Sequence, residues 1–277
     1  ALGVVDIVSW PLSAPVWRAR VRRYLGSADQ AAWLAEAVRR RTEEIQSIQE
    51  VTIMVLASLA ETRDVDTCNH IRRTQLYVKA LAEQLATQPR FAARLAPAVI
   101  DLIYRAAPLH DIGKVGIPDA VLRKQAHLRP EEFALIKAHT RLGRDAIAHA
   151  EKRLGGDVPF LRVAKEIAFC HQEKWDGSGY PQGLRGDAIP LSARLMAVAD
   201  VYDALITRRV YREPVEHEEA VRLILEGRGR HFDPAVVDAF VTIAPTFRAI
   251  ARAHADEEDS VATRQAPRCT AEAVPNA

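Results

Sequence analysis

Cysteine is scarce in this sequence, and the few cysteines are scattered. Cys68, Cys170 and Cys269 are the only three in 277 residues, and no two of them stand in a CxxC spacing. An odd set of widely separated cysteines argues against a disulfide framework. We therefore expect a protein of the reducing cytoplasm.

An excess of one charge is also missing. The 38 lysines and arginines nearly balance the 36 aspartates and glutamates, so the chain lacks the one-sided field that favours nucleic-acid polymers or membrane surfaces. The apolar run VTIMVLASLA at 51–60 is too short to cross a bilayer, and the first residues do not resemble a signal peptide. We expect neither a nucleic-acid polymer nor a membrane as a partner.

Strand patterns are confined to the start of the chain. GVVDIVSWP reads as a short buried strand and VWRARVRRYL as a helix after it, which together indicate the end of an α/β domain. Elsewhere apolar residues recur at helical spacing. The predicted helices cover residues 28–60, 67–88, 91–107, 130–153, 158–172, 191–206, 216–227 and 233–254. The sequence therefore predicts an all-α fold.

Four segments follow from this pattern. Residues 1–24 form the α/β remnant, residues 25–50 a linker helix, residues 51–254 the main helical domain, and residues 255–277 a disordered tail. Leu34, Val38, Ile45 and Ile48 recur along the linker like a short coiled-coil seam, which would pair two chains. One long helix packed on its own domain would show the same pattern, so both interpretations stay open.

Histidines and aspartates with metal-ligand character recur in the main domain. Asp66 and His70 lie one helical turn apart, His110 and Asp111 are adjacent, His139 and His171 follow, and Asp200 lies on an apolar helix. A buried carboxylate is costly unless it is paired or bound to a metal. A lone histidine is more often structural, so the indication comes from the ordered combination. Imidazole and carboxylate together suit iron, manganese, nickel or zinc.

The same segments carry groups suited to phosphate chemistry. Two transition ions side by side can clamp a phosphate ester for in-line displacement, with Asp111 as a bridge between them. Lys114 follows His110 by one turn and could neutralise phosphoryl oxygens. Arg209 and Arg212 follow Asp200, and an arginine fork matches a phosphate, although a solvated basic face is the alternative.

A glycine-rich loop follows His171 directly. Four of the 13 glycines, at positions 177, 179, 183 and 186, fall within ten residues. Glycine allows tight turns and positive φ angles, so this loop is predicted to fold closely beside the metal ligands. Tyr180 and Pro181 would stiffen it, and a rigid loop without a further role is the alternative for Tyr180.

These motifs resemble a known family. The runs HDIGKVGIPD, HTRLG and HQEKWDGSGYPQGLRGDAIPLSARLMAVADVYDALITRRVYR are similar to the HD-GYP domain, a bacterial branch of the HD metal-dependent phosphohydrolases associated with hydrolysis of cyclic di-GMP. The resemblance covers roughly residues 50–245. The first 24 residues resemble, more weakly, the last strand and helix of a response-regulator receiver domain, although Trp10 stands where receivers usually have lysine.

The resemblance implies a role for each matching residue. It implies a binuclear transition-metal centre, a catalytic lysine, a phosphate-binding pair, a neighbour of the guanine or ribose, and a GYP loop that contacts diguanylate cyclases. The implied metal ligands are Asp66, His70, His110, Asp111, His139, His171 and Asp200. The other implied residues are Lys114 for catalysis with Asp111, Arg209, Arg212 and Asp203 for substrate, and Gly179, Tyr180 and Pro181 for the loop.

Two residues depart from the family pattern. Gln172 stands where many members have a second histidine, and an amide is a poorer ligand for a transition metal. Asp66 stands where many members have glutamate, and the shorter side chain favours two ions over three. We keep both as candidate ligands.

The resulting hypothesis is a cytoplasmic, two-metal phosphodiesterase that opens cyclic di-GMP to pGpG, GMP or both. One alternative is a catalytically weak or inactive sensor of cyclic dinucleotides, and another is a phosphodiesterase for a different one, such as cyclic GMP-AMP. The expected partners are cyclic di-GMP, a second copy of the chain through the linker helix, a sensor histidine kinase through a receiver domain, and diguanylate cyclases through the GYP loop.

Overall fold

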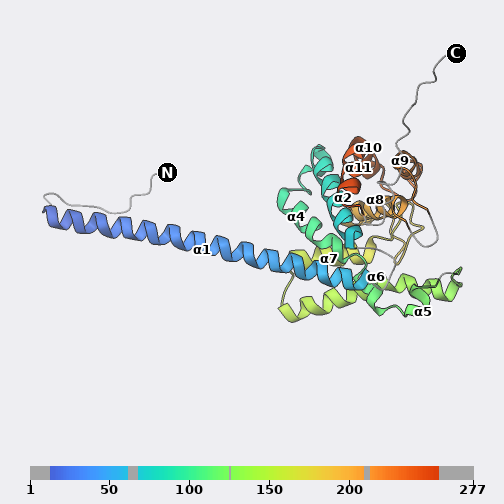
Figure 1. Cartoon of the computed structure of the whole chain (residues 1–277), viewed down its shortest axis with the longest axis horizontal. Helices are drawn as coiled ribbons and strands as arrows, with labels where there is room; N and C mark the ends of the chain where they lie inside the picture. The colour runs from blue at the N-terminus through green and yellow to red at the C-terminus, as the bar shows by residue number, and fades with distance from the viewer. Residues whose placement is uncertain (1–12, 62–67, 125, 209–212, 256–277) are drawn as a thin grey trace, which may run out of the picture. The chain divides into compact units, whose positions relative to one another are not determined.

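The structure is a computed structural model that describes residues 13–61, 68–124, 126–208 and 213–255 (Figure 1). These residues form helices and contain no β-strand, which confirms the all-α prediction for the described part. The chain divides into two compact units, residues 1–52 and 53–277. The predicted strand at the start and the tail after residue 255 lie outside the described residues.

The first helix, α1, runs from Ala14 to Glu61 without interruption. It crosses the expected boundaries after residues 24 and 50, so no break separates the segment assigned to the receiver remnant from the linker. Arginine and glutamate pairs stabilise its exposed surface, because side chains three or four residues apart on a helix are neighbours. Arg39, for example, contacts both Glu36 and Glu43 at 2.6 Å.

The core of the second unit forms around two helices, α2 (Cys68–Ala86) and α8 (Leu191–Ile206). Helix α2 contacts α8, α4 (Pro97–Ala106), α10 (Pro234–Thr242) and α11 (Ala244–Ala253) (Figure 1). Helix α8 is apolar on nearly all sides and almost entirely buried, as expected for a central helix. Tyr77, Tyr202, Phe240 and Phe247 pack as one aromatic cluster between these helices.

Helix α6 (Pro130–Leu154) begins and ends as its sequence predicts. Pro130 occupies the first turn, the carboxylate of Glu132 accepts the backbone N–H of Arg129 at 2.8 Å, and Gly155 ends the helix at a φ of 77°. Helix α6 packs against α7 (Pro159–Cys170) and against η2 (Ile112–Gly116), a short 3-10 helix that directly follows the His-Asp pair.

Shorter elements connect the main helices. They are α3 (Pro89–Ala92), η1 (Ala107–Leu109), α5 (Asp119–Leu122), η3 (Gly186–Ala188) and α9 (His217–Glu226). Two predicted helices are divided in the structure: the segment 91–107 contributes α4 after a separate α3, and the segment 233–254 is broken at Ile243. Among the described residues no single helix has the length and apolar character to span a membrane, and α10 with α11 meets that test only as a pair bent by 69°.

Candidate metal centre

Four buried histidines meet in the second unit, and each is held through the same ring nitrogen. The Nδ1 atom of each imidazole faces an acceptor oxygen, which places the proton on Nδ1 and leaves the lone pair on Nε2. The pairs are His70 with Asp203 Oδ2 at 2.8 Å, His110 with the Ala107 carbonyl at 3.1 Å, His139 with the Ile136 carbonyl at 2.7 Å, and His171 with the Ile167 carbonyl at 3.0 Å. In the neutral ring, all four Nε2 atoms are therefore candidate metal ligands.

Local structure explains how distant parts of the chain deliver these side chains. His110 lies directly after η1, where Pro108 shapes the turn, and Asp111 precedes η2. His139 lies in the middle of α6, and His171 follows the last residue of α7. Asp200 lies on α8 with its side chain about one fifth exposed, at 19%.

The first group of candidate ligands is Asp111, His139 and His171. Asp111 Oδ1 lies 3.1 Å from His139 Nε2 and 3.3 Å from His171 Nε2, and the two Nε2 atoms are 3.4 Å apart. Two ligand atoms that each lie about 2.1 Å from one ion are about 3.0–3.4 Å apart in octahedral or tetrahedral geometry. The spacing of this group therefore fits a single transition ion.

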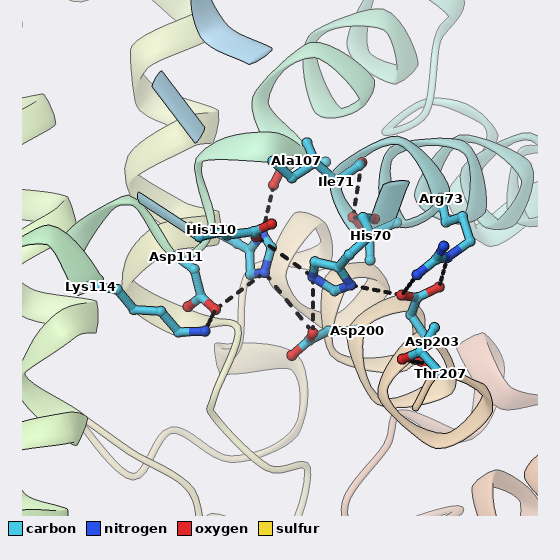
Figure 2. Close-up of polar contacts among 12 residues, drawn as sticks. His70, Ile71, Arg73, Ala107, His110, Asp111, Lys114, Asp200, Asp203 and Thr207 are labelled. Atoms are coloured by element: carbon cyan, nitrogen blue, oxygen red, sulfur yellow. Dashed lines mark hydrogen bonds and ion pairs between the residues drawn. The ribbon is translucent and has the colours of Figure 1, made fainter. Parts of the chain in front are cut away.

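The second group contains Glu61, His70, His110 and Asp200. His70 Nε2 lies 3.8 Å from Glu61 Oε1. Asp200 Oδ1 lies 3.8 Å from His70 Nε2 and 4.0 Å from His110 Nε2 (Figure 2). Within the described residues, His110 Nε2 has no hydrogen-bond partner although it is fully buried. A buried nitrogen in this state is costly unless another atom satisfies it, and a metal ion would do so.

Asp111 connects the two groups. Its Oδ1 belongs to the first group, and its Oδ2 lies 3.5 Å from His110 Nε2 and 2.8 Å from Lys114 Nζ (Figure 2). Burial alone would raise the pKa of Asp111, but Lys114 and the nearby histidines outweigh it and hold that pKa well below its ordinary value. The carboxylate is therefore ionised and could bridge two cations.

The two histidines that flank Asp111 differ in their electrostatics. Burial lowers the pKa of His110 to about 4, so this imidazole is neutral at pH 7 and able to ligate. Burial also disfavours the charged form of His139, but the Asp111 carboxylate outweighs it and raises the pKa of His139 overall. A cation in the first group would replace the proton that Asp111 attracts to His139.

The glycine-rich loop is folded around one buried carboxylate. Glu173 accepts the backbone N–H groups of Gln182 at 2.7 Å and Leu184 at 3.0 Å. A β-carbon on Gly179 would lie 2.2 Å from the backbone nitrogen of Lys174, so only glycine fits there. Glu173 could not be predicted from the sequence, because its function depends on backbone groups that only the folded loop presents.

Tyr180 lies beside the first ligand group. Its ring contacts the ring of His139 edge-to-face at a centroid distance of 6.4 Å, and the ammonium of Lys137 lies 5.4 Å from the Tyr180 ring centroid. The peptide bond between Tyr180 and Pro181 is cis. Tyr180 thus borders the first ligand group, and the roles of Gly179 and Pro181 stay predictions.

Several predicted site residues lie outside the described residues or are described only in part. Asp66, Arg209 and Arg212 fall in undescribed segments, so their roles stay predictions. For Gln172, which is half-buried, the structure shows a backbone contact: its carbonyl accepts the N–H of Tyr180 at 3.2 Å. Metal ligation by its amide stays a prediction.

One predicted role needs correction. Asp203 was expected to border the guanine or ribose of the substrate, but its side chain is completely buried, and its oxygens accept hydrogen bonds from His70 and Arg73. Burial alone would raise the pKa of Asp203, but the hydrogen bonds from His70 and Arg73 outweigh burial and lower that pKa below its ordinary value. A carboxylate enclosed in this way cannot touch a substrate without giving up one of these partners.

One candidate ligand was missed. Glu61 is the last residue of α1 and is 2% exposed, next to His70 and His110. It follows Ile53 and Ala57 at four-residue steps, so it continues a helical face whose earlier positions are apolar. A carboxylate on such a face was the available signal, but the predicted helix ended at residue 60 and left Glu61 outside it.

Comparisons with known proteins identify a family and several relatives of this chain. The family model described as "HD domain" matches residues 54–236. A Vibrio cholerae protein named "Probable cyclic di-GMP phosphodiesterase" is 53% identical over 94% of this chain and 60% of its own length. A second, named "Cyclic di-GMP phosphodiesterase", is 54% identical over 79% of this chain and 44% of its own length. A third, named "3'3'-cGAMP-specific phosphodiesterase 2", is 38% identical over 75% of this chain and 37% of its own length.

Proposed function

We propose that this chain, which belongs to the HD domain family and to its HD-GYP branch, is a metal-dependent phosphodiesterase that hydrolyses cyclic di-GMP. The observation that carries the proposal is the convergence of four Nε2 atoms and three carboxylates into two ligand groups joined by Asp111. The names of the two relatives at 53% and 54% identity support the substrate. The chain spans only 60% and 44% of their length, so the activity of the whole protein is part of the proposal.

Two transition ions would occupy the centre. Asp111, His139 and His171 would hold the first ion, and Glu61, His70, His110 and Asp200 the second, with Asp66 and Gln172 as further candidates. When bound, such ions act as Lewis acids on the phosphate and lower the pKa of water to supply a nucleophile near neutral pH. The donor set favours iron, manganese or nickel and also admits zinc. The first group is more compact, so we expect it to bind its ion more tightly.

The chain itself supplies the remaining charge and orientation. Lys114 is 12% exposed and contacts Asp111 Oδ2, which puts its ammonium at the edge of the centre. There it would offset charge on the phosphoryl oxygens as the phosphorus–oxygen bond to the leaving sugar breaks. Arg209 and Arg212 are proposed to hold the same phosphate from the segment after α8. The product would be pGpG, GMP or both.

A different cyclic dinucleotide is the competing substrate. The relative named as specific for 3'3'-cGAMP shows that this branch contains proteins named for both substrates. Both molecules carry the same phosphodiester backbone, so the metal centre cannot distinguish them. The ratio of kcat/KM values for cyclic di-GMP and 3'3'-cGAMP measures the preference.

A sensor that binds without turnover is the second alternative. Gln172 motivates it, because an amide in place of an imidazole weakens an ion site. Fewer than one transition metal per chain, together with binding of cyclic di-GMP and no turnover, would favour the sensor.

The proposal also includes partners. Leu34, Val38, Ile45 and Ile48 are each more than half exposed in α1, between 51% and 60%, and follow a heptad spacing interrupted by Arg41. We propose that a second copy of the chain covers this stripe as a coiled coil. Sedimentation of an Ile45→Asp, Ile48→Asp variant should show monomer where the unaltered chain is a dimer, and an unchanged dimer would refute this pairing. We also propose two protein partners: a sensor histidine kinase that acts through a receiver domain, and a diguanylate cyclase that binds the GYP loop. The proposed location is the cytoplasm.

Hydrolysis of cyclic di-GMP by the full chain tests the main proposal. The protein is purified without oxygen, supplied with Fe²⁺ or Mn²⁺, and assayed for pGpG and GMP. A His110→Ala, Asp111→Ala variant should lose turnover by at least about 1,000-fold, because it removes ligands from both groups. His149→Ala, an exposed histidine on α6, is the matched control. Full activity in the double variant would refute the proposal.

A further inference from the structure

His70 is held differently from the other three histidines of the centre. His110, His139 and His171 each donate from Nδ1 to a backbone carbonyl three or four residues earlier in the chain. His70 lies near the start of the described part of α2. Its Nδ1 instead contacts Asp203 of α8 at 2.8 Å.

Arg73 holds Asp203 in turn. Arg73 Nε donates to Asp203 Oδ1 at 2.7 Å, Nη2 donates to Oδ2 at 2.9 Å, and Nη1 donates to the carbonyl of His254 at 2.9 Å. Arg73 is 2% exposed and Asp203 is fully buried. This bidentate geometry fixes the orientation of the carboxylate more firmly than a single contact would.

Helical spacing couples these contacts to the metal ligands. On α2 the ligand His70 and the orienting Arg73 are three residues apart, and on α8 the ligand Asp200 and the orienting Asp203 are also three residues apart. Figure 2 shows Asp200 and Asp203 approaching His70 at opposite sides of the imidazole, with Arg73 beyond Asp203. The packing of α2 on α8 therefore brings the candidate ligands His70 and Asp200 together. The same packing brings Arg73 to Asp203, which orients His70.

We propose that Arg73 and Asp203 form a positioning pair that holds the proton of His70 on Nδ1 and thereby keeps its Nε2 available to the second ion. An ionised carboxylate accepts hydrogen bonds and donates none, so it admits only the Nδ1–H form of the neutral ring. Arg73 keeps that carboxylate in place and compensates its buried charge. The part of this inference that concerns the ion rests on the proposed metal-dependent function.

The tautomer of His70 is the direct test. Long-range ¹H–¹⁵N NMR of the full chain, freed of metal with a chelator, distinguishes the two neutral tautomers of each histidine. His70 of the unaltered chain should show its proton on Nδ1. If His70 of the unaltered chain carries its proton on Nε2, the inference is wrong, and the results with the variants cannot restore it.

Asp203→Asn replaces one acceptor oxygen by an NH₂ group of nearly the same shape. Arg73 donates to both oxygens of Asp203, so the amide loses one Arg73 contact in either orientation, and with its NH₂ group in the place of Oδ2 it turns a donor toward Nδ1. In that second orientation the proton of His70 moves to Nε2, and in either orientation we expect the affinity for the second Mn²⁺ ion to fall about 10–100-fold, with the first ion retained. Circular dichroism verifies the fold.

Arg73→Lys is the second variant, and it leaves the carboxylate as an acceptor. His70 should then keep its proton on Nδ1, while the loss of the bidentate contact weakens the second Mn²⁺ ion by less than Asp203→Asn does. Asp238→Asn is the matched control, because Arg228 holds Asp238 through the same two contacts, both at 2.8 Å, on the exposed surface. This control should keep the His70 tautomer and both ions.

The outcomes separate this inference from the proposed function. Two Mn²⁺ ions and turnover in the unaltered chain, with the tautomer and both ions unchanged in Asp203→Asn, overturn the positioning pair and leave the phosphodiesterase intact. An unaltered chain without turnover whose His70 tautomer still depends on Asp203 supports the positioning pair and overturns the phosphodiesterase.

Discussion

Gly113 and His139 approach so closely that a β-carbon on Gly113 would lie 1.9 Å from the carbonyl oxygen of His139. The same β-carbon would lie 2.5 Å from the backbone nitrogen of Gly143, so two turns of α6 rest directly on the backbone after the His-Asp pair. This contact sets the distance between Asp111 and His139. Asp111 lies two residues before Gly113, and His139 is itself the residue that Gly113 touches.

Gly113→Ala should therefore damage both stability and metal binding. Backbone atoms cannot rotate away as a side chain can, so η2 and α6 must separate, at a cost of about 3 kcal/mol in the free energy of unfolding. Denaturant unfolding and elemental analysis measure the two effects. Gly156→Ala is the control, since a β-carbon there meets no atom within 4 Å. Unchanged stability in Gly113→Ala would contradict the observed packing.

His139→Ala should remove one ion of two. The first ligand group would keep only Asp111 and His171, which is too few to retain an ion against a chelator. We expect metal content to fall from about two ions per chain to about one, with turnover reduced at least 100-fold. His149→Ala on the same helix should keep both. Two ions retained in His139→Ala would place the first site elsewhere.

Lys114→Met should lower kcat more than it raises KM. The ammonium would act where negative charge develops on the phosphoryl group, so its loss is expected to reduce kcat by about 100-fold or more. Steady-state kinetics with cyclic di-GMP separate the two constants. Lys152→Met, at an exposed position near the end of α6, is the control. A kcat equal to that of the unaltered chain would remove Lys114 from catalysis.

Glu132→Gln should produce a pH-dependent loss of stability. Hydrogen bonds from Lys124 and from the backbone of Arg129 lower the pKa of Glu132 to about 2 from 4.5. A carboxyl whose pKa is lower in the folded state contributes stability above its unfolded pKa and loses that contribution as the pH falls toward the folded value. The unaltered chain should therefore be more stable than the variant at pH 7, and the difference should shrink between pH 5 and pH 3. A constant difference in denaturant unfolding across this range would show that Glu132 titrates normally.

Local sequence signals were sufficient for most helices, and at one break an available signal was overlooked. Helix α8 has the predicted bounds, 191–206, because Pro190 precedes an unbroken apolar run. The division at Ile243 was not predicted, although Pro245 in the first turn of α11 is a signal that the preceding helix ends before it. Helix α1 continues without interruption past residue 24, across Gly26 and Ser27, although glycine and serine commonly mark a turn.

The amino-acid sequence by itself determined which chemical groups this protein can bring to a phosphate: the ordered histidines and aspartates, Lys114, and a glycine loop that no bulkier residues could form. Only the tertiary structure decided which of them meet, because metal ligation depends on positions in space that residues far apart in the chain reach through helix packing. It brought Glu61 beside His70 and His110, and it enclosed Asp203 behind His70 with Arg73. Residue types near a motif carry no information on such distances. For this reason Glu61 was not predicted as a ligand, and Asp203 was predicted to contact the substrate.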